Sequence, residues 1–204
     1  MVMNKKSIFV WYGISYFILL ILFSVYFRPL MDLDNKYFLL VNGFSNPLFD
    51  TFFQIITHLG SGWFWIIAIA ALWIANKRKL ATYLAVGALI DTVSVFVLKD
   101  IFLRPRPFEV LQNVKLLDME AGYSFPSGHS SLVFMSAAVI NKYYFYAIAI
   151  LVAISRIYLG VHYPFDVLIG GLNGIFIGLM VLNLDLKDLQ SRLENIWKRI
   201  VRMR

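Results

Sequence analysis

Residues 7–27 read SIFVWYGISYFILLILFSVYF, a run of 21 residues without a charged side chain. At a rise of about 1.5 Å per residue, a helix of this length crosses a hydrocarbon core about 30 Å thick. Lys5 and Lys6 precede the run, as in a signal peptide, but the run is longer than a signal-peptide core. It also ends in YFRP (26–29), without a small-x-small cleavage site. We therefore expect an uncleaved transmembrane anchor.

The same apolar character continues along the chain, in which 60% of the 204 residues are hydrophobic and 15% are charged, with a mean hydropathy of +0.71. In soluble domains about a quarter of the residues are charged, so the composition excludes a secreted or cytosolic globular protein. Further apolar runs occupy residues 61–75, 80–98, 126–140, 143–159 and 165–184. We predict one all-α domain over residues 1–204, a six-span transmembrane helical bundle. Several runs are short for a span, so their ends should lie in an internal cavity or against polar groups.

Two local patterns refine this picture of the bundle. In residues 48–60, Asp50, Gln54 and His58 recur every four residues before the break Gly60-Ser61-Gly62, which predicts an interfacial or re-entrant helix. In the last span, small residues recur every four positions at Gly170, Gly174 and Gly178. This spacing predicts close packing against a neighbouring helix.

The distribution of positive charge predicts the orientation of the bundle. With both termini in the cytoplasm, 12 of the 19 Lys and Arg residues lie on the cytoplasmic side, as the positive-inside rule requires. Residues 185–204 form an amphipathic basic tail on that side; we favour binding to anionic lipid, with a dimer seam as the alternative. The oligomeric state stays open. Because the basic residues are scattered between apolar runs, we expect no nucleic-acid partner.

Four of the seven remaining cations lie where three segments reach the outer side: KDIFLRPRP (99–107), SFPSGHS (124–130) and SRIYLGVHYPFD (155–166). Lys99 and Arg156 lie near membrane depth, where a charge is costly and marks a ligand or a pathway. Arginine also suits planar recognition of phosphate oxygens. These segments therefore predict a phosphate site, and the alternative is a cluster of snorkelling stop-transfer charges.

The individual residues of these segments indicate different roles in such a site. Arg104 and Arg106 each precede a proline, which holds the stretch extended and should place both guanidinium groups on an outer rim. The Pro126-Ser127-Gly128 start of a helix offers free N–H groups to an anion, although a plain N-cap would look the same. His162 lies in a short turn, and Asp166 four residues later could orient it for nucleophilic attack; the alternative is an exposed turn histidine.

Together the three segments resemble the signature motifs of the type-2 phosphatidic-acid phosphatase superfamily, which read Lys-x6-Arg-Pro, Pro-Ser-Gly-His and Ser-Arg-x5-His-x3-Asp. All three motifs are complete and in order between residues 99 and 166. The chain is also similar in size to bacterial phosphatidylglycerophosphatases of that superfamily. The resemblance implies a cell-membrane lipid phosphatase with no cofactor and no metal ion. The charge distribution predicts that its active site faces the extracytoplasmic side.

Carried over position by position, the resemblance implies a phosphohistidine mechanism. His162 would be the nucleophile, Asp166 would orient it, and His129 would protonate the leaving oxygen and then activate water. The phosphoryl oxygens would be bound by Lys99, Arg106, Ser127, Gly128 and Arg156. Arg104 forms a second Arg-Pro pair whose role stays open, because the spacing from Lys99 selects Arg106.

The substrate implied by the resemblance is the phosphate or pyrophosphate of a membrane lipid: phosphatidylglycerol phosphate, undecaprenyl pyrophosphate or phosphatidic acid. The sequence does not choose among these lipids, since every span supplies apolar surface for a tail. A non-catalytic carrier of phosphate or phospholipid is the alternative, but it would have no use for a His-Asp pair beside a second histidine. Asp91, inside a span and outside the motifs, is interpreted as a structural partner for another helix, with a functional intramembrane carboxylate as the alternative.

Overall fold

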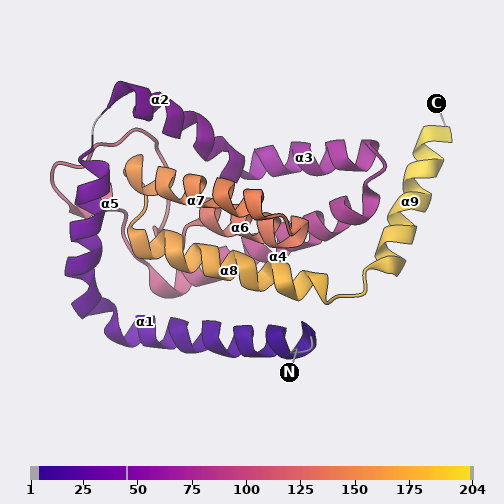
Figure 1. Ribbon diagram of the computed structural model, residues 1–204, viewed down its shortest axis with the longest axis horizontal. Helices are drawn as coiled ribbons and strands as arrows, with labels where there is room; N and C mark the ends of the chain where they lie inside the picture. The colour runs from indigo at the N-terminus through magenta and orange to yellow at the C-terminus, as the bar shows by residue number, and fades with distance from the viewer. Residues whose placement is uncertain (1–4, 45, 203–204) are drawn as a thin grey trace.

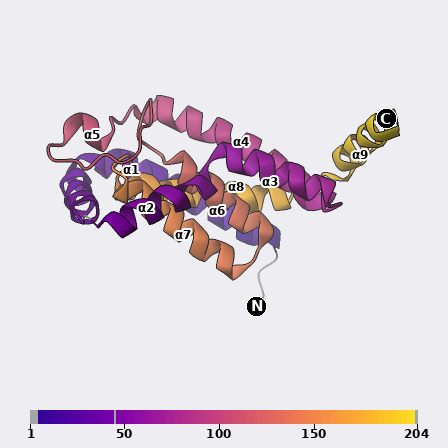
Figure 2. The ribbon, with the colours of Figure 1, turned by 90° about the horizontal axis from the view of Figure 1, so that it is seen from above.

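The computed structural model describes residues 5–44 and 46–202, and the regular structure in these ranges is entirely helical. In chain order the elements are α1 (Lys5–Asn42), α2 (Pro47–Ile56), η1 (Thr57–Gly60), α3 (Gly62–Ile74), α4 (Arg78–Phe102), α5 (Pro107–Val110), α6 (Gly128–Ile140), α7 (Tyr143–Tyr158), α8 (Pro164–Leu182) and α9 (Lys187–Arg202). The long helices lie side by side in a bundle, with α5 near one end and α9 at the other (Figures 1 and 2). The all-α prediction is confirmed for the described residues.

Helix α6 forms the centre of the bundle and packs most extensively against α8. Most of its side chains are buried, including Leu132, Met135 and Val139. The close approach predicted from the glycine repeat is confirmed. A Cβ built on Gly174 would lie 2.0 Å from the Ser131 carbonyl oxygen of α6, so only a residue without a side chain allows this contact.

Substitution of Gly174 by alanine should destabilise the bundle, because the new methyl group would force the backbones of α6 and α8 apart. Overpacking of this kind costs about 1–3 kcal/mol, so the thermal midpoint of the detergent-solubilised protein should fall. Gly62→Ala is the matched control, since nothing lies within 4 Å of a Cβ at that helical position. Equal thermal midpoints for the two variants would contradict the packing argument.

The number of spans is a separate question from the number of helices. Among the described residues, Arg78–Val110 and α8 are long and apolar enough to cross a membrane, and the bent pair formed by α2–η1 and α3 gives a third if it is one span. Helices α6 and α7 are apolar but shorter. The six-span count stays a prediction.

Helix α1 differs from the first span expected at residues 7–27, since it continues as one helix of 38 residues to Asn42. Figure 1 shows it running along the bundle and then turning across its end. Pro29 lies inside this helix, and a proline kinks a helix without having to end it. The extension carries Asp34 and Asn42 to the end of the bundle, where both are buried.

The break expected near Gly60-Ser61-Gly62 is present, because residues 47–60 and α3 meet at a bend of 56°. One face of α2 then holds the loop between α5 and α6: Asp50 pairs with Lys115 Nζ at 2.6 Å, and Gln54 Nε2 donates to the Leu117 carbonyl. His58, the third member of the sequence stripe, is exposed. The bent segment thus anchors a loop above the ends of α4, α6 and α8.

The C-terminal tail predicted for residues 185–204 is helical as α9 over Lys187–Arg202, while residues 203–204 lie outside the described part of the chain. Figures 1 and 2 show α9 projecting from the end of the bundle opposite α5. Its apolar residues Leu189, Leu193 and Ile196 are exposed. An anionic membrane surface stays the predicted partner of this face.

Candidate active site

The three segments singled out in the sequence meet at one end of the bundle. Each contributes from a helix end: Lys99 from the last turn of α4, Arg106 from the N-cap of α5, His129 from the start of α6, Arg156 from the last turn of α7 and Asp166 from the first turn of α8. His162 lies in the turn between α7 and α8 and is buried. The structure therefore brings together every charged residue and both histidines of the predicted site.

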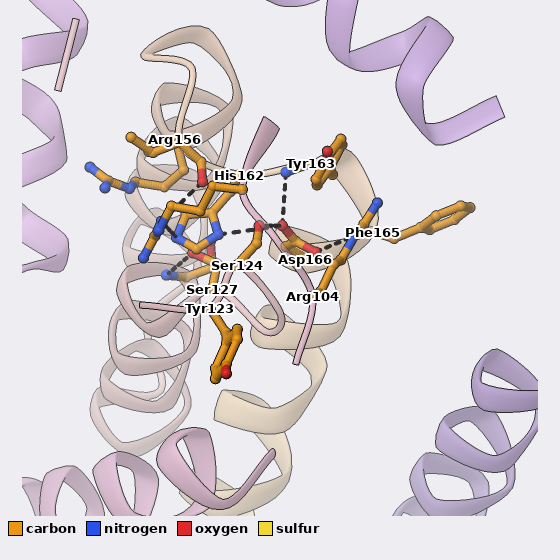
Figure 3. A network of polar contacts seen from close by, with 12 residues as sticks. Arg104, Tyr123, Ser124, Ser127, Arg156, His162, Tyr163, Phe165 and Asp166 are labelled. Carbon is orange, nitrogen blue, oxygen red and sulfur yellow. Dashed lines mark hydrogen bonds and ion pairs between the residues drawn. The ribbon is translucent and has the colours of Figure 1, made fainter. Parts of the chain in front are cut away.

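Asp166 is fully buried beneath His162 and is held from several sides (Figure 3). Its Oδ2 atom accepts a hydrogen bond from the Tyr163 backbone N–H at 2.9 Å and another from the Ser124 hydroxyl. His162 Nδ1 lies 3.4 Å from the same oxygen, but it is buried without a well-aligned hydrogen bond. Catalytic contacts of this type tighten when a substrate binds. Because Nδ1 faces Asp166, the other ring nitrogen, Nε2, faces away from it.

The expectation that both arginines of the Arg-Pro repeat lie on an outer rim is wrong, because Arg104 and Arg106 are both buried. The surroundings of Arg104 show why. Arg104 is only 4% exposed, and its guanidinium bridges Asp166 Oδ1 at 2.6 Å and Asp34 Oδ2 at 2.7 Å. The guanidinium also lies over the Tyr163 ring, 3.7 Å from its centroid. The carboxylates of Asp166 and Asp34 balance the buried positive charge of Arg104. The extended Arg-Pro backbone directs this side chain inward, beneath the site.

Asp34 is a residue that the sequence motifs did not identify. It comes from the extension of α1, and besides the ion pair with Arg104 it accepts a hydrogen bond from the Phe165 N–H at 3.0 Å. The first turn of α8 is thereby connected to α1 through two carboxylates and one arginine. A carboxylate close after an apolar span was the available signal, but the expected end of that span at residue 27 concealed it.

The two other arginines of the predicted site are buried, and Arg106 lies beside His162. Arg106 is 2% exposed; its Nε donates to Gly122 O at 2.8 Å, and its Nη1 donates to Val161 O at 3.0 Å and lies 3.4 Å from His162 Nε2. Arg156 is fully buried and pairs through Nη1 with Asp118 Oδ2 at 2.8 Å. These bonds hold both guanidinium groups in place, which is the preorganisation that binding of an anion requires.

Glu120, also absent from the motifs, lies at the point where these cations and both histidines meet. Its Oε2 is 2.9 Å from Arg106 Nη1 and 3.3 Å from His162 Nε2, and its Oε1 is 3.2 Å from His129 Nδ1. Oε1 also contacts Arg156 Nη2. Burial raises the pKa of Glu120, but hydrogen bonds from the two histidines and the charge of Arg156 dominate and hold it well below its ordinary value. Glu120 is therefore ionised.

The motif residues Ser127 and Gly128 open α6 beside this cluster. The Ser127 N–H donates to the Asp166 carbonyl at 3.0 Å, and the Ser127 hydroxyl accepts from the Ser130 N–H at 3.4 Å as the N-cap of the helix. Ser127 is fully buried. The N-cap alternative thus accounts for its side chain, whereas its role toward phosphate stays a prediction.

A cavity of about 510 Å³ opens from the cluster and runs along α4. Its polar end is lined by Lys99, Arg106, Glu120 and His129, with Gly128 beside them. Val95, Phe96 and Leu132 line its apolar part, and Asp91 lies on its wall about 12 Å of helix away from Lys99. The cavity thus combines a charged end at His129 with an apolar wall.

Asp91 contacts side chains of both central helices. It accepts a hydrogen bond from the Ser131 hydroxyl of α6, and the Asn173 amide of α8 lies 3.4 Å from the same oxygen. Asn173 Nδ2 also donates to Ser131 Oγ at 2.9 Å. These contacts support the interpretation of Asp91 as a structural partner for neighbouring helices, and its role stays a prediction because it also lines the cavity.

Comparisons with known proteins agree with this geometry. The family model described as the PAP2 superfamily matches residues 76–189. An undecaprenyl-diphosphatase of Sulfolobus acidocaldarius is 28% identical over 90% of this chain and 97% of its own, and a lipid A 4'-phosphatase of Porphyromonas gingivalis is 31% identical over 74% and 72%. The crystal structure of a transmembrane PAP2-type phosphatidylglycerolphosphate phosphatase from Bacillus subtilis superposes with a TM-score of 0.72, at 28% identity over 82% of this chain and 92% of that one. The family match covers the segments that carry His129, His162 and Asp166.

Proposed function

Because the chain belongs to the PAP2 superfamily, we propose that it hydrolyses the phosphomonoester or pyrophosphate group of a membrane lipid through a phosphohistidine intermediate. The observation that carries the proposal is the convergence of His162 Nε2, His129 and two buried arginines on a point already occupied by a carboxylate. A site that binds the oxygens of a carboxylate can also bind the oxygens of a phosphoryl group. The relatives support lipid phosphate chemistry, since they include an undecaprenyl-diphosphatase, a lipid A 4'-phosphatase and a phosphatidylglycerolphosphate phosphatase.

The proposed reaction proceeds in two displacements. His162 Nε2 attacks phosphorus and forms the P–N bond while the P–O bond to the lipid breaks and His129 gives its proton to the leaving oxygen. His129 then takes a proton from water, whose oxygen attacks phosphorus, and His162 leaves as the P–N bond breaks. Lys99, Arg106 and Arg156 neutralise the charge on the phosphoryl oxygens throughout. Asp166 fixes the tautomer of His162 and stabilises its positive charge.

The tail of the substrate follows from the cavity. Val95, Phe96 and Leu132 provide an apolar wall next to the phosphoryl position, which suits an acyl or prenyl chain. Phosphatidylglycerol phosphate, undecaprenyl pyrophosphate and phosphatidic acid all combine such a chain with a terminal phosphate. These three lipids are the proposed substrate candidates.

The test is phosphate release by the purified protein from a panel of these three lipids, with an excess of EDTA throughout. Release from at least one lipid is expected, and it should survive the chelator because guanidinium and ammonium groups supply the positive charge. Release that requires an added divalent ion would overturn the metal-independent mechanism. Binding of a lipid phosphate without any release would instead favour the carrier.

We also propose that the site faces the extracytoplasmic side of the cell membrane, as the charge distribution predicts. Because the chain has no cysteine, single cysteines report location cleanly. Met119→Cys, on an exposed position of the loop above the site, should react with a membrane-impermeant maleimide in intact cells. Lys77→Cys, exposed at the start of α4, should react only after lysis. The opposite pattern would put the site in the cytoplasm.

A further inference from the structure

The Glu120 carboxylate takes the position that the proposed mechanism assigns to the phosphoryl group. One of its oxygens lies 3.3 Å from the attacking atom His162 Nε2, and the other lies 3.2 Å from His129 Nδ1. Two guanidinium groups, those of Arg106 and Arg156, clamp the same carboxylate. A substrate phosphate needs these same four partners, so substrate and carboxylate cannot occupy the position together.

The backbone on either side of Glu120 is held independently of its carboxylate. Arg106 donates to the Ala121 and Gly122 carbonyl oxygens at 3.0 and 2.8 Å, and the Leu117 N–H donates to the Leu159 carbonyl at 3.0 Å. The Glu120 side chain itself is 21% exposed and borders the cavity. It can therefore leave the cluster by rotation of its side chain, without displacement of the loop.

A tethered carboxylate competes with every anionic headgroup that reaches the site. Its effective concentration is on the order of millimolar or higher, as for other intramolecular ligands on short connections. A phosphomonoester carries about −1.5 to −2 charges at pH 7, and a pyrophosphate carries more. Both are therefore attracted more strongly than the carboxylate to the two arginines and the lysine. A phosphodiester headgroup carries a single negative charge and has no such advantage.

We propose that Glu120 is a specificity-determining residue: its carboxylate fills the phosphoryl position of the resting site, yields it to a phosphomonoester or pyrophosphate, and excludes the phosphodiester headgroups of bulk phospholipids. The need for such exclusion follows from the membrane setting, where phosphodiester lipids greatly outnumber a terminally phosphorylated one. This inference rests on the proposed function, because it concerns the same site.

The decisive variant is Glu120→Gln, which keeps the size of the side chain and removes its charge. Binding of inorganic phosphate to the purified protein, measured by calorimetry in a neutral detergent, should tighten by about tenfold or more, which corresponds to about 1.4 kcal/mol. In mixed micelles, phosphatidylglycerol should become a competitive inhibitor of lipid phosphate hydrolysis by the variant at concentrations that leave the wild-type rate unaffected.

Asp118→Asn is the matched control, since Asp118 lies on the same loop and accepts from Arg156 Nη1 at 2.8 Å, outside the cluster of short contacts around His162. The amide oxygen of asparagine can still accept this hydrogen bond, so the guanidinium keeps its position and only the charge is removed. Its effect on phosphate affinity should stay within about threefold, less than a single unit of log affinity. If both variants change the affinity equally, general loss of negative charge near Arg156 explains the result and the proposal for Glu120 is wrong.

The calorimetric arm separates failure of this inference from failure of the proposed function. Wild-type protein that neither binds phosphate nor releases it from any lipid would overturn the proposed function. Wild-type protein that does both, with phosphate affinity unchanged in Glu120→Gln, would overturn the role of Glu120 alone. A fall in kcat of Glu120→Gln with unchanged phosphate affinity would likewise replace competition by a role in the chemical step.

Discussion

His162→Ala protein should release no phosphate from any lipid and should carry no covalent label, whereas His129→Ala protein should still form the phosphoenzyme. Loss of the nucleophile removes the P–N bond on which both steps depend, so kcat should fall on the order of 10⁴-fold or more. His129 serves only as proton donor and acceptor in this scheme. Its loss should therefore matter less when the leaving group needs little protonation, as with a lipid pyrophosphate or an activated ester.

Rapid mixing with substrate labelled in its phosphoryl group, followed by acid-free trapping, distinguishes the two histidines. Label should accumulate on His129→Ala protein, because hydrolysis of the intermediate is slowed more than its formation. Label on His162→Ala protein would show that another residue is the nucleophile. Equal losses for both variants with the monoester and the pyrophosphate would contradict the assignment of His129 as the acid.

Replacement of Arg104 by methionine should lower kcat by on the order of 10²-fold or more while KM changes little. Arg104 does not reach the phosphoryl position; it holds Asp166 Oδ1 at 2.6 Å, and Asp166 in turn orients His162. In the proposed mechanism Arg104 is thus a positioning residue. The variant should also be unstable, because breaking a buried ion pair costs about 3–5 kcal/mol, and both Asp34 and Asp166 would lose their partner.

The double variant Arg104→Met/Asp34→Asn separates stability from positioning. Neutralising Asp34 removes one of the two stranded carboxylates, so the thermal midpoint should partly recover, whereas kcat should not, since Asp166 still lacks its arginine. Arg104→Lys should be intermediate, because an ammonium group cannot bridge two carboxylates with the geometry of a guanidinium. A raised KM with normal kcat in Arg104→Met would instead place this residue among the phosphate ligands.

A feature of the fold or of the site can be predicted from the sequence when the contacts that determine it are local. Apolar runs and helix-end motifs depend on neighbouring residues, which explains why the positions of the helices, the glycine seam and the cluster of motif residues are predictable. The continuation of the first helix beyond residue 27 is not predicted, because Arg28 and Pro29 resemble a stop signal, whereas the helix runs through them to Asn42.

The residues that sequence reasoning missed all act across long chain separations. Asp34 meets Arg104 from a helix 70 positions away, and Glu120 meets His162 from a loop that carries no motif of its own. The direction of Arg104 was wrong for the same reason: an extended Arg-Pro backbone does not reveal which way a side chain points. Carboxylates that pair with motif arginines are found only once the fold brings them together.

The close contact between α6 and α8 also keeps the two histidines at a fixed position relative to each other. Gly170 of α8 lies so close to Ser127 that a Cβ there would be 2.5 Å from the Ser127 carbonyl oxygen, and the Ser127 N–H donates to Asp166 at the same level. The helix that carries His129 and the helix that follows His162 are therefore coupled at their first turns. When lipid composition or bilayer thickness tilts the bundle, donor and nucleophile should move as one rigid body, so their separation, and with it the chemical step, should be insensitive to the host membrane even where substrate access is not.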